Sequence, residues 1–340
     1  MMFKMTTLAL AATAAFALPF APRAAQAEQL TVASFLPGPH HLHTRMLAWF
    51  GDELEQQSGG DLTIQVFPGG QLGAGPVQQY KRALEGVADM TLGVSAYTPT
   101  VFPKTMLAIL PGSSENAVES TGRLWDAYEE HLADEYEDVK LIALMTVAGN
   151  VISATRDMST LEAYAGAKLV PYAAMTQPIL ESIGAVPVQM PITDVYTGLS
   201  TGTIDAAYTA YSNITPPWNF WDVSSHFIEN VPVHFAVLFV VMNKERYEGL
   251  SDEHRALIDG LSGRVLSMKG AESFDLADTV SKEQMDAEPD KMKNSQRVVL
   301  SDAERARVVE ASQAGLQAIF EDYRSKGIED AEAVYQALNP

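Results

Sequence analysis

A short pattern occurs twice in this chain, and it constrains the fold more than any other feature. Tyr80 is followed by Gly86-Val87-Ala88-Asp89 and an apolar run, and Tyr196 is followed by Gly202-Thr203-Ile204-Asp205 and another apolar run. Each copy is typical of a helix that ends at a glycine and leads through a turn into a buried strand. The duplication predicts two similar α/β lobes with a small-molecule cleft between them. Chance similarity between two ordinary helix-to-strand turns is the alternative.

The N-terminal residues have the pattern of a secretory signal peptide. Lys4 precedes an apolar run that is too short to span a membrane, and Ala25-Gln26-Ala27 matches an A-x-A cleavage site. We therefore exclude residues 1–27 from the fold. The chain has no cysteine, which excludes disulfides, thiolate metal sites and a lipid-anchored cysteine. We expect a protein that is secreted across the inner membrane and stays soluble in the periplasm, without a lipid anchor.

The composition excludes two classes of partner. The chain has 340 residues, enough for two domains, and its 47% hydrophobic and 19% charged residues are typical of a soluble globular protein. The formal net charge is −20 at pH 7, and loss of the leader removes Lys4 and Arg23 but no acid. Nucleic acids and anionic membranes are not expected as partners, because both require a basic surface.

Helical and strand-like segments alternate along the mature chain. Strand patterns such as residues 30–35 and 62–67 are separated by a helical pattern, which predicts mostly parallel sheets with helices on both faces. Residues 148–151 and 233–235 are expected to cross between the lobes as hinge strands, since no Pro/Ser/Gly-rich linker is present. From Ser251 the pattern is helical nearly to the end. The predicted units are a first lobe of residues 28–148 plus 236–275 and a second lobe of residues 149–235 plus 276–340.

Several stretches follow the order and spacing of one protein family. They are Ser58-Gly59-Gly60-Asp61-Leu62, Val66-Phe67-Pro68-Gly69-Gly70-Gln71-Leu72-Gly73, Gly86 to Met90, Gly166-Ala167-Lys168-Leu169, Met190-Pro191, Asp194-Val195-Tyr196 and Met242-Asn243-Lys244. On these the chain resembles the solute-binding proteins of TRAP (tripartite ATP-independent periplasmic) transporters. The resemblance implies a two-lobed periplasmic binding protein fold, a hinge that closes on a solute, and delivery to the integral-membrane subunits of a secondary transporter. It also implies that the protein is not an enzyme.

The chain lacks the arginines with which many members of this family hold a substrate carboxylate. Where the family has one after Gly-Leu-Lys-Ile, this sequence reads Gly166-Ala167-Lys168-Leu169-Val170, so Val170 takes its place. A second family arginine is absent from the crossing strand Gly149-Asn150-Val151. Without a guanidinium group, a carboxylate enclosed in the cleft would be an unpaired buried charge, at a cost of several kcal/mol. We therefore expect a ligand other than a simple organic acid.

Aromatic residues stand where strands are expected to end at the cleft. Aromatic faces attract cations by about 0.5–2 kcal/mol each. The sequence therefore predicts a small organic cation or amino alcohol, of the ethanolamine or choline kind, with Asp222 or Glu229 as its charge partner. Core packing is the alternative for any single aromatic residue. The predicted ligand-binding residues are Phe35, His40, His41, Tyr97, Asn150, Val170, Tyr172, Tyr208, Tyr211, Trp218 and Phe235.

Other functions stay open from the sequence alone. The ligand alternatives are an organic acid bound through a non-standard basic residue, such as Lys168 or Arg156, and a neutral polyol. A sensor component built on the same lobes is a further alternative. A periplasmic hydrolase would need a nucleophile beside an oriented base, which no motif supplies. We predict a monomer with no catalytic residues, no cofactor and no metal site, although His40 and His43 stand three residues apart.

Overall fold

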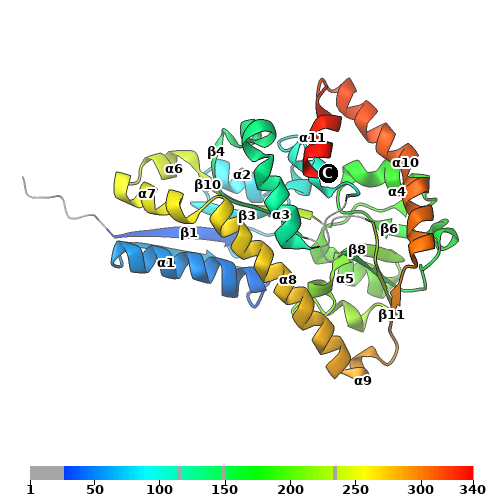
Figure 1. Cartoon of the computed structure of the whole chain (residues 1–340). Helices are drawn as coiled ribbons and strands as arrows, with labels where there is room; N and C mark the ends of the chain where they lie inside the picture. Colours follow the sequence, from blue (N-terminus) through cyan, green and yellow to red (C-terminus); the bar gives the residue numbers. More distant parts are fainter. Residues whose placement is uncertain (1–26, 113–115, 148–149, 233–235, 340) are drawn as a thin grey trace, which may run out of the picture.

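Two β-sheets, each packed against helices, organise the chain, and they occupy the left and right of Figure 1. The computed structural model describes residues 27–112, 116–147, 150–232 and 236–339. We call the part around the five-stranded sheet lobe I and the part around the six-stranded sheet lobe II. The predicted two α/β lobes, with helices on the sheets and a helical C-terminal region, are confirmed. The prediction of mostly parallel sheets is wrong for lobe I, where two strand pairs are parallel and two are antiparallel, because the strand Ala236–Asn243 returns from lobe II.

Lobe I has a mixed sheet with the strand order β2-β1-β3-β10-β4. β1 is parallel to β2 and β3, whereas β10 is antiparallel to both of its neighbours. β10 arrives from lobe II, so it enters the sheet from the opposite end. The strands are β1 (Glu28–Ser34), β2 (Leu62–Phe67), β3 (Met90–Val94), β4 (Val139–Val147) and β10 (Ala236–Asn243).

Lobe II repeats this design with the strand order β11-β9-β5-β8-β6-β7. Here β5, which follows the lobe I strand β4, is antiparallel to both β8 and β9, while the β6–β7, β6–β8 and β9–β11 pairs are parallel. Each lobe therefore receives one reversed strand from the other. The strands are β5 (Asn150–Ala154), β6 (Lys168–Val170), β7 (Val186–Pro187), β8 (Ala206–Ala210), β9 (His226–Glu229) and β11 (Gln296–Val299).

Helices cover both sheets, and two of them are long. The α-helices are α1 (Ala48–Ser58), α2 (Gln79–Leu84), α3 (Ala117–Asp126), α4 (Gln177–Ser182), α5 (Ile192–Thr201), α6 (Lys244–Glu248), α7 (Asp252–Leu261), α8 (Arg264–Ala287), α9 (Pro289–Met292), α10 (Asp302–Ser325) and α11 (Ala331–Leu338). The short 3-10 and π helices are η1 (Leu42–Leu47), η2 (Ser95–Tyr97), η3 (Thr105–Ile109), η4 (Tyr128–Leu132), η5 (Ala133–Tyr136), η6 (Leu161–Tyr164), η7 (Ala174–Thr176), η8 (Tyr211–Asn213) and η9 (Phe220–Asp222). α8 runs from lobe I to lobe II, as Figure 1 shows.

The core lies on both faces of the lobe I sheet, which is why its strands are almost continuously apolar. Along β10, Val240 and its alternate neighbours pack into one cluster, while Phe239 and its alternates pack into the other. Each fully buried side chain of this size contributes about 1.5–3 kcal/mol. Phe239 lies opposite Gly93 in the β3–β10 pair, and a side chain on Gly93 would collide with the Phe239 ring. Gly93 is therefore required by packing.

The duplicated sequence pattern has the same structure in both lobes. Gly86 and Gly202 each adopt a left-handed backbone, with φ of 65° and 70°, which favours glycine. The aspartate that follows each of them binds a backbone N–H of the adjacent parallel strand. The Asp89 carboxylate accepts from Thr31 N on β1 at 2.7 Å, and the Asp205 carboxylate accepts from Lys168 N on β6 at 2.8 Å. The two copies therefore pin equivalent strand pairs.

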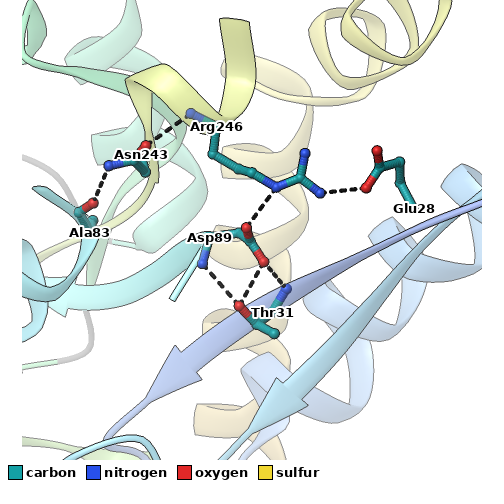
Figure 2. Close-up of polar contacts among 6 residues, drawn as sticks. All are labelled: Glu28, Thr31, Ala83, Asp89, Asn243 and Arg246. Atoms are coloured by element: carbon teal, nitrogen blue, oxygen red, sulfur yellow. Dashed lines mark hydrogen bonds and ion pairs between the residues drawn. The ribbon is translucent and has the colours of Figure 1, made fainter. Parts of the chain in front are cut away.

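In lobe I this aspartate belongs to a larger polar network, drawn in Figure 2. Asp89 also accepts from Arg246 Nε at 2.8 Å, and Arg246 Nη2 donates to Glu28 at 2.6 Å. Asn243 caps α6 by accepting from Arg246 N at 2.9 Å and donates to the Ala83 carbonyl at 2.8 Å. The network ties the start of β1 to the end of β10, opposite the ends of these strands that face lobe II.

Some sequence predictions fall outside the described residues. They include nearly all of the leader, and residues 148–149 and 233–235 of the expected hinge strands. The strands before and after each of these gaps belong to different sheets: β4 and β10 to lobe I, and β5 and β9 to lobe II. The C-terminal helix α11 packs against η3 and α3 of lobe I. The lobe boundaries at 148/149, 235/236 and 275/276 remain a proposal. Among the described helices, none has the length and apolar character that a membrane crossing requires.

Candidate ligand-binding site

A cavity of about 90 Å³ lies where strand ends from both lobes meet. In lobe I, Phe35 follows β1 and Tyr97 ends η2, directly after β3. In lobe II, Tyr172 follows β6 and Ser212 follows β8. The carboxyl ends of parallel strands are where ligands bind in open α/β sheets, so the topology of both lobes points to this cavity.

Side chains from every part of the fold line the cavity. From lobe I and α8 they are Phe35, Leu36, His40, Val94, Ala96, Tyr97, Val147, Ala236, Leu238 and Phe274. From lobe II they are Val170, Pro171, Tyr172, Ala173, Gln189, Met190, Ile192, Val195, Tyr208, Ala210, Ser212, Asn213 and Trp218. No Asp, Glu, Lys or Arg is among these described residues, so the cavity wall that they form carries no formal charge.

Three aromatic pairs shape this wall. The Tyr172 and Tyr208 rings lie 4.3 Å apart and tilted. Phe35 meets Tyr97 edge to face at 6.5 Å, and His40 meets Trp218 in the same way at 6.5 Å. Burial raises the pKa of Tyr97 to about 12 and also raises the pKa of Tyr172 and Tyr208. These phenols are therefore neutral at physiological pH and present π faces, not phenolate charges.

His40 is also neutral. Its side chain is 4% exposed, and burial lowers its pKa well below the usual value, with the fields of His41 and His43 adding to the effect. The Leu42 backbone N–H donates to His40 Nδ1 at 3.2 Å, which favours the tautomer with the proton on Nε2. His40 therefore supplies a neutral N–H group and an aromatic edge.

A few polar groups accompany the aromatic faces. Asn213 Oδ1 accepts from Ala210 N at 2.9 Å, which leaves the Asn213 amide NH₂ as a donor at the wall. The Trp218 indole N–H is buried and has no hydrogen-bond partner among the described residues. An unsatisfied buried donor costs about 1–3 kcal/mol, and this one lies behind the surface of the wall, out of contact with the cavity.

The structure brings most of the predicted ligand-binding residues together. Phe35, His40, Tyr97, Val170, Tyr172, Tyr208 and Trp218 all line the cavity. His41 and Tyr211 do not. His41 packs its ring on Phe274 at 4.6 Å, and Tyr211 lies under Lys282. Phe235 and the side chain of Asn150 lie outside the described residues.

The two predicted charge partners are engaged elsewhere. Asp222 pairs with Lys291 at 3.2 Å, beside a separate surface pocket. Glu229 pairs with Arg297 at 2.5 Å. The alternative basic residues, Lys168 and Arg156, are exposed and do not line the cavity.

Sequence reasoning missed several wall residues. Phe274 comes from α8, far along the chain, and its helical spacing is that of an ordinary core residue. Gln189 and Asn213 are polar residues with no motif around them, although Asn213 follows the second copy of the repeat. Among the described residues, no three His, Asp or Glu side chains gather as a metal site would require.

The family comparison decides what kind of protein this is. The model of bacterial extracellular solute-binding protein family 7 matches residues 33–322. The chain belongs to this family. A family 7 member is a solute-binding protein and not an enzyme, and the resemblance to TRAP solute-binding proteins seen in the sequence is confirmed.

Individual relatives of this family 7 protein are distant. A solute-binding protein of Albidiferax ferrireducens (strain T118) is 26% identical over 204 residues, which is 58% of this chain. The match spans 60% of that relative's length.

Solved structures share the fold. One is a TRAP solute-binding protein from Rhodoferax ferrireducens T118 with copurified benzoate (TM-score 0.84, 24% identity, 92% of this chain and 96% of that one). Another is a marine metagenome TRAP solute-binding protein specific for aromatic acid ligands, with metahydroxyphenylacetate bound (TM-score 0.84, 23% identity, 91% of this chain and 96% of that one).

Proposed function

We propose that this protein captures a small solute between its two lobes in the periplasm and delivers it to the membrane subunits of a TRAP-type secondary transporter. Family membership and the cavity at the strand ends support this role. The signal-peptide pattern and the absence of cysteine support a soluble, unanchored periplasmic protein. We further propose that it acts as a monomer.

The proposed solute is a small organic cation, with ethanolamine as the first candidate. The observation that carries this proposal is the described wall, which is rich in π faces and has no guanidinium group for a carboxylate. A cation gains about 0.5–2 kcal/mol from each aromatic face, most where water is excluded.

The size of the cavity favours the smaller candidates. Its volume of about 90 Å³ is below the roughly 150 Å³ that holds benzene in an engineered protein cavity. Ethanolamine fits this space better than a benzene ring does, and choline requires the lobes to open slightly. With four heavy atoms at about −1.5 kcal/mol each, ethanolamine reaches about −6 kcal/mol, or a Kd of tens of micromolar.

An aromatic acid is the second candidate. It is favoured by the fold neighbours, whose ligands are benzoate and metahydroxyphenylacetate, and by the neutral N–H group of His40. The missing arginines argue against an aromatic acid. Neutral donors alone compensate only part of the free energy lost when an anion leaves water.

A thermal-shift panel tests the proposal, since a ligand that binds the native state raises the melting temperature. Ethanolamine and choline are expected to stabilise the protein, and benzoate and 3-hydroxybenzoate are not. The variant Tyr208→Leu removes a π face from the wall and should abolish most of the shift. Tyr196→Leu, on the exposed face of α5, is the matched control. If only the acids raise the melting temperature, the proposal of a cationic solute is refuted.

A further inference from the structure

A carboxyl group lies buried close behind the cavity wall. Asp278 on α8 is 6% exposed, and no ion pair joins it to a basic residue within the described part of the chain. Its Oδ1 accepts from the Ser212 backbone N–H at 3.1 Å. Asp278 is not among the residues that line the cavity. Burying an acid without a charge partner costs free energy.

Its position links it to the cavity from two sides. Ser212, its hydrogen-bond donor, is a wall residue, and Phe274, one helical turn earlier on α8, is another. Ser281, one turn later on the same face, donates to the Tyr211 carbonyl at 2.6 Å. The Asp278 side chain is therefore clamped between α8 and η8, at the segment where lobe II meets the cavity.

The charged and titratable groups around Asp278 are few. On α8 itself, Lys282 lies with its ammonium 4.0 Å from the centre of the Tyr211 ring, and Asp275 accepts from the first N–H groups of α3 at 2.8 and 3.1 Å. The titratable group of η8 is Tyr211. Directly before η1 stands His41, whose Nδ1 lies 2.8 Å from the Ser273 hydroxyl of α8. Burial is the largest influence and raises the pKa of Asp278 well above its usual value.

We propose that Asp278 is the counter-charge for the cationic solute and that solute capture releases its proton to solvent. The inference rests on the proposed function. In the empty protein the carboxyl keeps its proton because burial disfavours the carboxylate. A cation in the neighbouring, formally uncharged cavity favours the carboxylate, so the O–H bond ionises as the solute enters. In the complex, the positive charge of the solute and the negative charge of the Asp278 carboxylate then lie on opposite sides of Ser212.

Linkage fixes the direction of the pH effect. If binding releases a proton, affinity rises with pH until the pKa of the empty protein is passed, and falls at lower pH. A low-pH surrounding would therefore promote release of the solute. A purely structural Asp278, which only holds η8 to α8, would give no such dependence.

Calorimetry with ethanolamine at matched pH values between about pH 6 and pH 7.5, in phosphate and in ACES, tests this, because neither buffer carries a net positive charge that could compete for the cavity. The two buffers differ in their heat of proton uptake, so a difference in the observed heat counts the protons released. The wild type is expected to release part of a proton within this pH range. The variant Asp278→Asn keeps an acceptor for Ser212 N and is expected to release none and to bind about tenfold more weakly. Glu283→Gln, an exposed carboxyl on the same helix, is expected to match the wild type.

The outcomes separate the two proposals. Ethanolamine binding with equal heats in both buffers and unchanged affinity in Asp278→Asn would overturn the role of Asp278 and leave the cation function intact. Absence of binding by any amine would refute the cation function, and the role of Asp278 with it. Because proton release is measured in the wild type, the test does not depend on the folding of the variant.

Discussion

The Tyr97 hydroxyl accepts a hydrogen bond from the backbone N–H of Ile192, with 3.1 Å between the oxygen and the nitrogen. Tyr97 stands at the end of β3 in lobe I, and Ile192 begins α5 in lobe II. The first N–H groups of a helix lack intrahelical partners, so Tyr97 satisfies one of them. Both residues line the cavity, and the bond therefore joins the two lobes at the cavity wall.

We predict that Tyr97→Phe weakens the contact between the two lobes. The variant keeps the ring but loses the acceptor, at a cost of about 1–1.5 kcal/mol, which corresponds to about tenfold weaker solute binding. The loss should appear mainly as faster dissociation in stopped-flow experiments. Tyr247→Phe, which removes a surface hydroxyl bonded to Asp259, is the control. Equal dissociation rates for both variants and the wild type would contradict a latch at Tyr97.

The repeat aspartates give a prediction about stability. Asp89→Asn keeps one acceptor oxygen but loses the ion pair with Arg246, and we expect a loss of about 2 kcal/mol. Asp205 has no comparable ion pair among the described residues, so Asp205→Asn should lower the free energy of unfolding by only about 1 kcal/mol. Urea unfolding measures both, with Asp52→Asn, an exposed carboxyl, as the control. If all three variants have the same free energy of unfolding, the two repeat aspartates do not stabilise the strand pairs.

The buried histidines predict loss of stability in acid. Burial, with smaller effects of Arg45 and His43, lowers the pKa of His41 to about 3. His41 is partly exposed, but its ring lies 4.2 Å from that of His40 and meets Phe274 edge to face at 4.6 Å. Between about pH 6.5, the unfolded value, and about pH 3 the unfolded chain binds more protons, so stability falls as the pH falls. We expect His41 to account for about 1–2 kcal/mol of the loss between pH 7 and pH 5.

The matched variant for this test is His41→Asn, which retains a polar atom for Ser273. Burial raises the pKa of Glu135 to about 7 and also raises the pKa of Asp278. These two groups oppose the trend, since their protonation in the fold increases stability as the pH falls. The relevant quantity is therefore the difference between wild type and variant in unfolding free energy at pH 7 and pH 5. An unchanged difference would contradict the lowered pKa of His41 in the folded protein.

The sequence was most informative where local patterns and spatial neighbours coincide. The repeat predicted two lobes because the glycine, the turn and the aspartate act on adjacent parallel strands. Tyr97 and Tyr172 were identified because residues that follow parallel strands reach the same edge of a sheet.

It was less informative where distant segments meet. Glu229 was predicted to be a charge partner of the solute, but β11 pairs in parallel with β9 and brings Arg297 to it. Phe274 and Asp278 belong to a helix whose pattern shows only that one face is buried. Which cavity that face meets depends on the packing of α8 across both lobes, and no local pattern in the sequence reports it.

The central claim is that the cavity selects its solute by positive charge against π faces. Calorimetry with ethanolamine, 1-propanol and benzoate tests this most directly, because 1-propanol has the shape of ethanolamine with a methyl group in place of the ammonium. We expect ethanolamine to bind with a Kd of tens of micromolar, and 1-propanol and benzoate to give no measurable heat. Heat with benzoate alone, or equal affinity for 1-propanol and ethanolamine, would contradict it.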